Sequence, residues 1–551
     1  MFYKGIIFDL DDTLYDYKKC NEYAIEKVIN YIINHNDKYK NYQYILDVYN
    51  KISIHLKHEL KNTASSHNKS IYFKQLIEEL KLNYSYFKTL NNLYWTNFYN
   101  SMVCFEGVKD FIIWNKINGI KIGILTDYET EYQIMKLEKV ELLNYVDYIV
   151  TSEEVGIEKP SVNMFYTILK KMNLQAEDVI MIGDNYEKDI MGALNVGIKS
   201  YWFNKDNAEC NNFKELHSKF TIIYNYLKDL MCISKYCGER FDLVQAGGGN
   251  TSVKVDDFMF IKASGYNLTN MDMFHGYVTI NNKLLLHDIH GNSTKEVTNY
   301  NYIGNKRGSI ETFMHSILKK YTIHLHPVQI NRVLVSVKAK DIIKQIYPTG
   351  LIIDYLTPGI KVCNEILKVY NNENVIFLLN HGIIITCDHV NEIYEILNEV
   401  LNSFESYQNI KYDKYKFTNQ ISKTINSTFG VNNISYLCQD EIICKYLNNK
   451  YELFREKLTF PDCLIYCGVK ILFGLNNIQE YKELYEECPK IIIENCDIYI
   501  NSHSLTKCKE IEEVFKSNLL ILDSEFQKVY LSNEEICFLN NWDAEKYRKL
   551  L

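Results

Sequence analysis

The sequence predicts an α/β protein of several domains, and three observations support this prediction. Short apolar runs alternate with helical patterns over residues 1–230, which is typical of a parallel sheet covered by helices. A second alternation follows over residues 231–430, and a smaller one over residues 431–551. A chain of 551 residues is also too long for one hydrophobic core, so two to four domains are expected.

The first of these domains, residues 1–230, is expected to contain a buried parallel sheet. Its predicted strands are Gly5–Phe8, Ile122–Leu125, Tyr148–Val150, Val179–Ile182 and Ser200–Phe203. A mostly helical insert, about residues 16–100, separates the first two strands; it is either a cap over a site or a plain helical subdomain. After the polar stretch Asn204–Asn212, the helix-like Phe213–Leu230 closes the domain, so the boundary is placed near residue 230.

The last piece of the chain, residues 431–551, reads as a small α/β extension. Its apolar runs are Cys463–Phe473, Ile491–Ile500 and Leu519–Leu522. It ends in a predicted helix that opens with a capping box, Ser532 and Glu535, in which each side chain bonds the other residue's backbone N–H.

The composition excludes several classes of protein. Hydrophobic content of 47% and charged content of 24% are ordinary for a globular protein, and a net charge of −8 argues against nucleic acid as the main partner. The apolar run before Asp9 is too short for a signal peptide, and no stretch has the length needed to cross a membrane. The 15 cysteines form no CxxC pair, which suits a reducing cytoplasm.

Asp9 and Asp11 follow the first predicted strand, at the edge where α/β sheets carry their chemistry. With one residue between them, both side chains face the same side of an extended chain. One carboxylate could attack phosphorus and the other could move the proton of the leaving oxygen and of water. Alone, the pair is also compatible with an acidic loop that has no catalytic role.

Three later features favour phosphate chemistry. Thr126 follows the second strand and could bond phosphoryl oxygens, while the ammonium of Lys159, beside Pro160 at a predicted helix start, could neutralise them. Asp184 follows the strand Val179–Ile182, and Asp189 lies five residues further on; such acids can hold Mg²⁺ through oxygen ligands.

The motifs DLDDT, Thr126, Lys159 and GDNYEKD together resemble those of the haloacid dehalogenase (HAD) superfamily over about residues 1–205. The resemblance implies a Rossmann-like domain with Asp9 as nucleophile and Asp11 as acid and base. It also implies Mg²⁺ on Asp9, the backbone carbonyl of Asp11 and Asp184, with Asp189 supporting the metal or Lys159. The insert matches the family's first cap position, which goes with small-molecule substrates. Asp11 favours a phosphatase over a dehalogenase, and a phosphomutase stays open.

A second site is predicted around three histidines. His324 and His326 lie on one face of the predicted strand Thr322–His326, and His381 follows the apolar run Val375–Leu379. Three imidazoles with an open position suit catalytic Zn²⁺ or a related divalent ion. An isolated pair of this kind is equally compatible with structural histidines, so the surrounding motifs decide.

Several phosphate-binding candidates accompany the histidines. The glycine-rich loop Ala246–Ser252 could surround an anion with N–H groups, or be a simple turn. Lys262–Gly265 and Arg307–Ser309 add hydroxyl and backbone donors, and Ser309 is expected to begin a helix whose N-terminus favours phosphate. Glu311 lies close to that end, whereas His315 is interpreted as a packing residue.

The patterns GGNTS, KASG, RGSIET, HLHP and NHG resemble the class II aldolase/adducin family over about residues 231–430. That family includes sugar-phosphate aldolases, epimerases, methylthioribulose-phosphate dehydratases and non-catalytic adducins. The resemblance implies Zn²⁺ on His324, His326 and His381, and Glu311 as the proton-transfer group. It places phosphate at Gly249, Asn250, Ser264, Gly265 and Ser309, and it favours a homo-oligomer. Glu311 favours an aldolase or a dehydratase over an epimerase, and the three histidines argue against adducin-like loss of activity.

The C-terminal extension carries Pro461, Asp462 and Tyr466, and it ends in the motif 541–547. These resemble the extension of aldolase–short-chain-dehydrogenase fusions, although here the dehydrogenase is absent. The extension either has a structural role or shapes the aldehyde pocket.

The sequence thus predicts a cytoplasmic bifunctional enzyme: a Mg²⁺-dependent phosphatase and a zinc-dependent aldolase acting on a ketose 1-phosphate or dihydroxyacetone phosphate. Its expected partners are small phosphorylated sugars, not nucleic acid or membrane. One alternative pairs a methylthioribulose-phosphate dehydratase-like unit with the phosphatase. Another pairs the phosphatase with a non-catalytic, adducin-like binding module.

Overall fold

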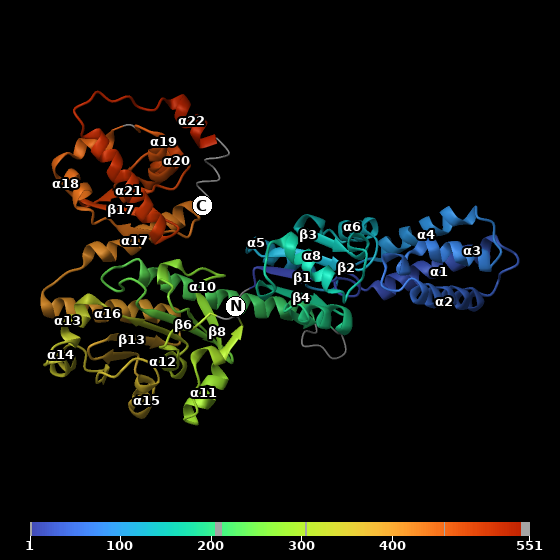
Figure 1. Ribbon diagram of the computed structural model, residues 1–551, viewed down its shortest axis with the longest axis horizontal. Helices are drawn as coiled ribbons and strands as arrows, with labels where there is room; N and C mark the ends of the chain where they lie inside the picture. Colours follow the sequence, from blue (N-terminus) through green and yellow to red (C-terminus); the bar gives the residue numbers. More distant parts are fainter. Residues whose placement is uncertain (1–2, 204–211, 304–305, 457, 542–551) are drawn as a thin grey trace. The chain divides into compact units, whose positions relative to one another are not determined.

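The computed structural model describes residues 3–203, 212–303, 306–456 and 458–541 (Figure 1). These residues form two compact units, divided between Tyr224 and Asn225. Most of the predicted polar stretch Asn204–Asn212, and residues 542–547 of the C-terminal motif, lie outside the described residues. Among the helices described, none combines the length and the hydropathy that a bilayer crossing requires.

The N-terminal unit is built on a parallel sheet in the order β3-β2-β1-β4-β5. The strands are β1 (Gly5–Phe8), β2 (Lys121–Thr126), β3 (Tyr148–Thr151), β4 (Val179–Gly183) and β5 (Lys199–Trp202). All five predicted strands are confirmed, each within one residue of its expected bounds. Because β2, β1 and β4 are parallel neighbours, the loops that follow them emerge together at one edge of the sheet.

Helices connect these strands and cover the sheet. They are α5 (Val108–Ile117), α6 (Thr130–Lys139), α7 (Ser152–Val155), α8 (Val162–Met172) and α9 (Gly192–Leu194). The core contains Phe165 and Ile168 of α8 packed with Ile7 and Met181 of the sheet. The predicted α/β class with a parallel sheet is therefore confirmed for this unit.

The predicted helical insert is present between β1 and α5 and is called the cap. It consists of α1 (Tyr17–His35), α2 (Tyr42–Glu59), α3 (Lys69–Glu79) and α4 (Tyr86–Ser101), which gather into a bundle beside the sheet (Figure 1). The side chains of Asp16, Asn41 and Asn68 accept bonds from backbone N–H groups in the first turns of α1, α2 and α3. Such N-caps satisfy donors that a helix leaves free, which explains where these helices begin.

The helix predicted over Phe213–Leu230 continues further than expected. It is α10 (Phe213–Gly238), so its predicted end at Leu230 is about two turns too early. The reason is local: Ser234 and Cys237 extend the buried helical spacing of Leu227 and Leu230. The predicted domain boundary near residue 230 therefore falls inside a continuous helix.

The C-terminal unit opens with a mixed eight-stranded sheet, ordered β11-β12-β13-β10-β6-β7-β8-β9. The strands are β6 (Asn250–Val255), β7 (Phe258–Lys262), β8 (Tyr277–Asn281), β9 (Asn301–Ile303), β10 (Tyr321–Leu325), β11 (Leu351–Ile353), β12 (Val375–Leu378) and β13 (Gly382–Cys387). Its helices are α11 (Asn282–His290), α12 (Thr312–Ile317), α13 (Val328–Leu334), α14 (Ala339–Ile346), α15 (Ile360–Val369) and α16 (Val390–Gln408). Only β11 and β12 pair in parallel among the described ladders of this sheet.

The predicted C-terminal α/β extension is also confirmed as a fold, with a sheet ordered β14-β17-β16-β15. Its strands are β14 (Ile434–Leu437), β15 (Leu472–Phe473), β16 (Ile491–Glu494) and β17 (Asp497–Ser502). Its helices are α18 (Glu441–Asn449), α19 (Pro461–Cys467), α20 (Ile478–Tyr485), α21 (Leu505–Leu522) and α22 (Asn533–Asn541). The preceding helix α17 (Asp413–Phe429) lies before the predicted start at residue 431, yet its Ile421 and Ile425 pack with Tyr499 of this sheet. The predicted capping box opens α22: Ser532 N donates to Glu535 Oε2 at 2.8 Å and Glu535 N to Ser532 Oγ at 3.2 Å.

Candidate active sites

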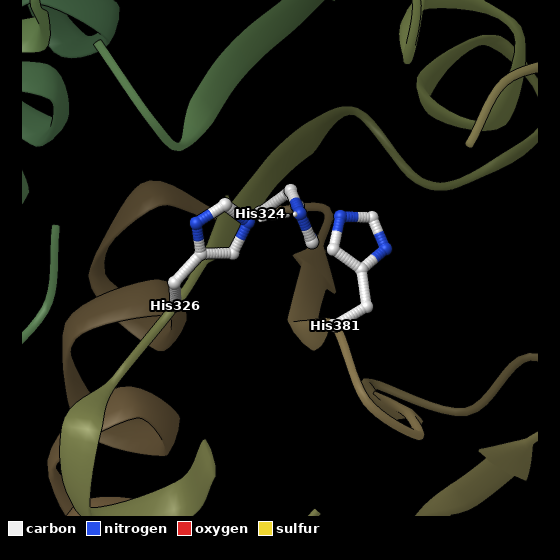
Figure 2. A group of neighbouring side chains, drawn as sticks. All are labelled: His324, His326 and His381. Atoms are coloured by element: carbon white, nitrogen blue, oxygen red, sulfur yellow. Dashed lines mark hydrogen bonds between the residues drawn. The ribbon is translucent and has the colours of Figure 1, made fainter. Parts of the chain in front are cut away.

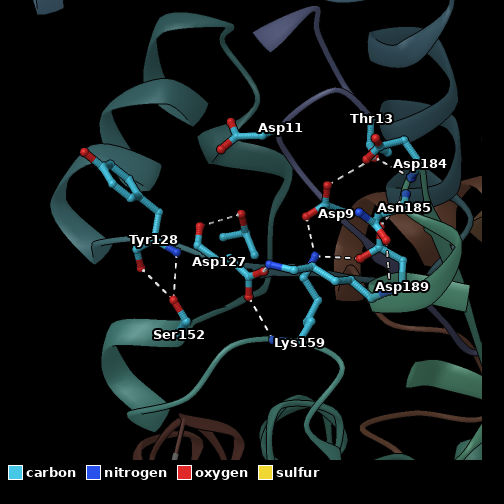
Figure 3. Close-up of polar contacts among 12 residues, drawn as sticks. Asp9, Asp11, Thr13, Asp127, Tyr128, Ser152, Lys159, Asp184, Asn185 and Asp189 are labelled. Atoms are coloured by element: carbon cyan, nitrogen blue, oxygen red, sulfur yellow. Dashed lines mark hydrogen bonds and ion pairs between the residues drawn. The ribbon is translucent and has the colours of Figure 1, made fainter. Parts of the chain in front are cut away.

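Asp9, Lys159 and Asp189 form a buried ionic cluster at the carboxyl edge of the first sheet. Lys159 Nζ donates to Asp9 Oδ1 at 2.5 Å and to Asp189 Oδ1 at 2.6 Å, as Figure 3 shows. Asp9 follows β1, Lys159 precedes α8, and Asp189 follows β4, so the parallel topology brings together residues that are far apart in sequence. One ammonium holds two carboxylates in place.

Asp184 lies on the other side of Asp9 and is joined to it through Thr13. The Thr13 hydroxyl is 3.2 Å from Asp9 Oδ2 and 3.2 Å from Asp184 Oδ1, and it accepts from Asp184 N at 3.0 Å. Gly183 permits Asp189 to pack closely against the end of β4, because a Cβ at residue 183 would lie 2.5 Å from the Asp189 side chain. The glycine of the GDNYEKD motif is therefore required by a close approach.

Asp11 lines the same cavity but is held by different partners. Both of its carboxylate oxygens accept from Lys136 Nζ at 2.8 Å, and Tyr15 OH also donates to it. Gln133 joins Asp11 to Thr126: its amide donates to Thr126 Oγ1 at 2.6 Å and to Asp11 Oδ2 at 3.3 Å. All six residues predicted for this site from the four motifs line one cavity: Asp9, Asp11, Thr126, Lys159, Asp184 and Asp189.

The donor set fits a hard divalent cation. Oxygen atoms of Asp9, Asp184 and Asp189 lie within 4.8 Å of one another, and carboxylate oxygens are the ligands that Mg²⁺ prefers. Burial raises the pKa of Asp9 well above its usual value against the opposing effect of Lys159, and burial with Asp189 raises the pKa of Asp184 to about 6. Three acids facing one ammonium leave excess negative charge that a cation would compensate. Asp189 is the weakest candidate ligand, because Lys159 and Asn185 N already occupy its two oxygens.

The three predicted histidines also come together in the C-terminal unit. His324 lies on β10, His326 follows that strand, and His381 lies in the turn between β12 and β13; their rings face one another in Figure 2. His324 Nε2 and His326 Nε2 are 3.0 Å apart, and one nitrogen from each of the three rings fits within 4.8 Å. Burial lowers the pKa of His324 to about 3 and also lowers that of His326. Three converging imidazoles are suited to bind Zn²⁺ or a similar ion.

Glu311 lies against this trio. Its Oε1 is 3.3 Å from His324 Nε2 and 3.3 Å from His381 Nε2, while Asn250 Nδ2 donates to its other oxygen. Burial opposes ionisation of Glu311, but the neighbouring histidines outweigh it and lower its pKa below the usual value. The carboxylate is thus ionised and positioned to act as a base beside the histidines.

A glycine makes the close approach of the histidines possible. A Cβ at Gly382 would lie 2.3 Å from the carbonyl oxygen of Leu325 and 2.8 Å from the ring of His326. The glycine that follows His381 in the NHG motif is therefore needed so that β13 can pack against the end of β10.

The predicted phosphate-binding residues are only partly brought together. Asn250 and Ser309 both contact Glu311, since Glu311 N donates to Ser309 Oγ at 3.2 Å. Ser264 and Gly265 are exposed, and Ser264 N donates to Arg307 O at 2.8 Å, which joins this loop to the segment before Ser309. The expectation that Ser309 begins a helix is wrong: α12 begins at Thr312, with Glu311 in the N-cap position.

Further residues contribute to both sites, and two of them in the first site, Lys136 and Asp127, carry no motif signal. Lys136 pairs with Asp11 from α6, and Asp127 accepts from Lys159 N at 2.9 Å and from Lys188 Nζ at 2.7 Å. In the second unit Lys262, the first residue of the KASG motif, has a role that the motif did not indicate: its Nζ donates to Gly247 O at 3.1 Å and to Tyr266 O at 2.8 Å, which fastens the glycine-rich loop to the loop after β7. Isolated lysines on helices and strands are common, so only their burial reveals them. His315, interpreted as a packing residue, is buried and bonded to Ser252 Oγ at 2.8 Å.

Comparisons with known proteins agree with both halves of this description. Residues 6–203 match the haloacid dehalogenase-like hydrolase family, and residues 228–407 match the class II aldolase and adducin N-terminal domain. A ribulose-1,5-bisphosphate 5-phosphatase of Halopiger xanaduensis is 31% identical over 210 residues, covering 36% of this chain and 84% of that protein. A glyceraldehyde 3-phosphate phosphatase of Pyrococcus furiosus is 30% identical over 212 residues, covering 36% of this chain and 80% of that protein.

A solved N-terminal class II aldolase domain from Thermoplasma acidophilum has 24% identity and a TM-score of 0.30, covering 33% of this chain and 92% of that one. The family matches confirm the prediction of an enzyme with one hydrolase-type and one aldolase-type part. The chain therefore belongs to the haloacid dehalogenase-like hydrolase family through residues 6–203, and its residues 228–407 match the class II aldolase and adducin N-terminal domain.

Proposed function

We propose that the chain is a bifunctional sugar-phosphate enzyme, with a Mg²⁺-dependent phosphatase and a zinc-dependent aldolase that uses a ketose 1-phosphate or dihydroxyacetone phosphate. One observation supports the proposal: each unit brings together side chains that could hold a metal ion beside a carboxylate that could move a proton. Asp11 accompanies the acidic set, and Glu311 accompanies the histidine set. The relatives that hydrolyse small sugar phosphates support the first half.

In the phosphatase, an Asp9 oxygen attacks phosphorus and the bond to the leaving oxygen breaks. Asp11 donates its proton to that oxygen and then accepts a proton from the water that cleaves the aspartyl-phosphate. Lys159 holds Asp9 in place and balances phosphate charge, and Thr126 is proposed to bond the phosphoryl oxygens. Mg²⁺, held by Asp9 and Asp184 with the backbone carbonyl of Asp11, would neutralise further charge on the phosphate. Asp189 would support Lys159.

In the aldolase, Glu311 moves the proton at the carbon beside the substrate carbonyl, because its ionised carboxylate lies at the histidine trio. Asn250 keeps Glu311 oriented, and the phosphate is proposed to bind near Gly249, Asn250, Ser309, Ser264 and Gly265. A divalent ion held by His324, His326 and His381 would act there as a Lewis acid on the carbonyl.

The proposal extends to the organisation of the chain. We assign the phosphatase to residues 1–230 with its cap at about 16–100, the aldolase domain to 231–430, and a supporting extension to 431–551. The substrates would be small phosphorylated sugars, and the aldolase part would form a homo-oligomer in the cytoplasm.

The Mg²⁺ concentration that gives half-maximal phosphatase activity is expected to rise as the pH falls through about 6. The pKa of Asp184 is raised from 3.8 to about 6, so the folded chain without metal binds this proton more tightly than the unfolded chain does. The free energy of unfolding without metal therefore decreases as the pH rises from 3.8 to about 6. Mg²⁺ compensates that charge above about pH 6 and competes with the proton below it. Magnesium titrations of p-nitrophenyl phosphate hydrolysis at about pH 5 and about pH 7.5 measure this. Equal half-maximal concentrations would contradict it.

The aldol half-reaction can be tested without knowing the aldehyde. The Asp9→Asn variant, which cannot consume the probe, is incubated with dihydroxyacetone phosphate and Zn²⁺ in D₂O. NMR then follows deuterium exchange at the hydroxymethyl carbon. We expect exchange that requires both Zn²⁺ and Glu311, because proton removal at this carbon needs a base and a polarised carbonyl.

The matched variant is Glu311→Gln in the same background, which keeps the shape of the side chain and removes the base. Bound zinc is measured in parallel, so that lost exchange is not confused with lost metal. Exchange that persists in Glu311→Gln, or that needs no metal, would refute the proposed aldolase role.

A further inference from the structure

The lining of the phosphatase cavity includes two cations of the cap that the proposed mechanism does not use. The cavity measures about 540 Å³ and is lined by core residues and by residues of the cap. The core contributes the acidic cluster around Asp9, whereas the cap contributes the cations Lys57 and Lys69. A cavity of this volume suits a small ligand.

Lys69 is an unusual cation because it is almost completely buried. It opens α3, is 6% exposed, and its ammonium lies 4.8–6.0 Å from the ring centres of Tyr17, Tyr49, Tyr72 and Tyr94. Among the described residues the ammonium donates one hydrogen bond, to Tyr49 OH at 3.3 Å, while the backbone N of Lys69 donates to Tyr128 OH. The rings stabilise the positive charge, but they supply no counter-charge.

No carboxylate pairs with Lys69 in the described parts of the chain. Among the acids of the described residues, Asp11 raises the pKa of Lys69, and Asp11 is already bonded to Lys136. Burial, and then Lys57 and Lys136, lower the pKa of Lys69 to about 7. A buried cation that lacks a counter-ion is costly, and an anion placed beside it in the cavity would remove that cost.

Lys57 adds a second cation from the cap to the lining of the cavity. It lies on α2, is exposed, and forms no ion pair in the described parts of the chain. Lys57 and Lys69 therefore present two cations, without acidic partners, to a space that also contains the nucleophile. The third nearby cation, Lys136, is already bonded to Asp11.

We propose that Lys69 and Lys57 form a second anion-binding site in the cap, and that the phosphatase substrate carries a second anionic group at the end opposite the scissile phosphate. The inference rests on the proposed phosphatase function. The shared chemistry is a small molecule with a phosphate at one end and a phosphate or a carboxylate at the other. Lys69 would select this substrate by pairing with the distal group.

The test compares matched substrates. Ribulose 1,5-bisphosphate is compared with ribulose 5-phosphate, and 3-phosphoglycerate with glyceraldehyde 3-phosphate, in the full chain with Mg²⁺. The wild type is expected to favour the doubly anionic member of at least one pair, and the favoured pair shows whether the distal group is phosphate or carboxylate. Lys69→Met is expected to lower kcat/KM for that member about 10- to 100-fold more than for its partner.

Two further variants make the result decisive. Lys57→Met removes an exposed cation without disturbing the tyrosine-lined site. It is expected to lower the ratio of kcat/KM for the doubly anionic substrate to kcat/KM for its partner about 3- to 10-fold. Lys61→Met changes an exposed cap lysine that does not line the cavity, and the ratio should stay at the wild-type value.

The outcomes separate the two hypotheses. If no substrate, p-nitrophenyl phosphate included, is hydrolysed in a manner that requires Asp9, the proposed phosphatase function fails. If hydrolysis requires Asp9 but the wild type shows no preference, or neither lysine variant changes the ratio, the second anion site is overturned.

Discussion

Asp9→Asn is expected to lower phosphatase activity by about 10⁴-fold or more, because an amide cannot attack phosphorus. The exchange reaction of the aldolase unit should remain. Asparagine has nearly the same shape, and Lys159 keeps its bond to Asp189, so the cluster is expected to stay folded. Hydrolysis of p-nitrophenyl phosphate with saturating Mg²⁺ is the measurement.

The matched control is Asp110→Asn, an exposed acid in the first turn of α5 that does not line the cavity. It removes one negative charge from the same unit and should leave the rate unchanged. Activity of Asp9→Asn above about one hundredth of the wild-type value would show that another group attacks phosphorus.

His381→Ala is expected to weaken zinc binding about 100-fold or more and to abolish deuterium exchange. The substitution removes one of three converging imidazoles. Even the loss of a group that only orients a metal ligand typically lowers metal affinity 10- to 100-fold. His381 lies in a turn and is partly exposed, so its removal leaves the strands intact. Zinc per chain after equilibrium dialysis, measured together with exchange, gives the result.

His389→Ala serves as the control, because His389 is exposed at the start of α16 and belongs to the same unit. It should bind zinc as the wild type does. If the wild type itself holds far less than one zinc per chain, the histidine trio does not form a metal site, and an adducin-like binding module becomes the better interpretation.

Much of the fold could be read from local patterns. The buried strands β1, β2 and β4 of the first sheet can be predicted within one residue, because buried parallel strands are short continuous apolar runs. The end of α10 was missed because Ser234 is polar, yet it occupies a buried position of the helix. The start of α12 was missed because Ser309 resembles an N-cap, whereas its hydroxyl accepts from Glu311 N in the turn before the helix.

In the candidate sites, too, some residues can be identified from local sequence patterns and others cannot. Acids and histidines at fixed short spacing identified Asp9 and Asp11, and His324 and His326. Lys136 and Lys69 could not be identified, because a lysine on a helix is exposed in most proteins and nothing local marks the two that are buried.

The sequence by itself determined the two families, the order of the strands along the chain and the chemical type of each candidate site, because these depend on residue type and short spacing. Only the tertiary structure decided that Asp11 is held by Lys136 and that Lys69 has no acidic partner among the described residues. Those facts depend on which helices pack over the sheet edge, and so on contacts between residues far apart in the chain.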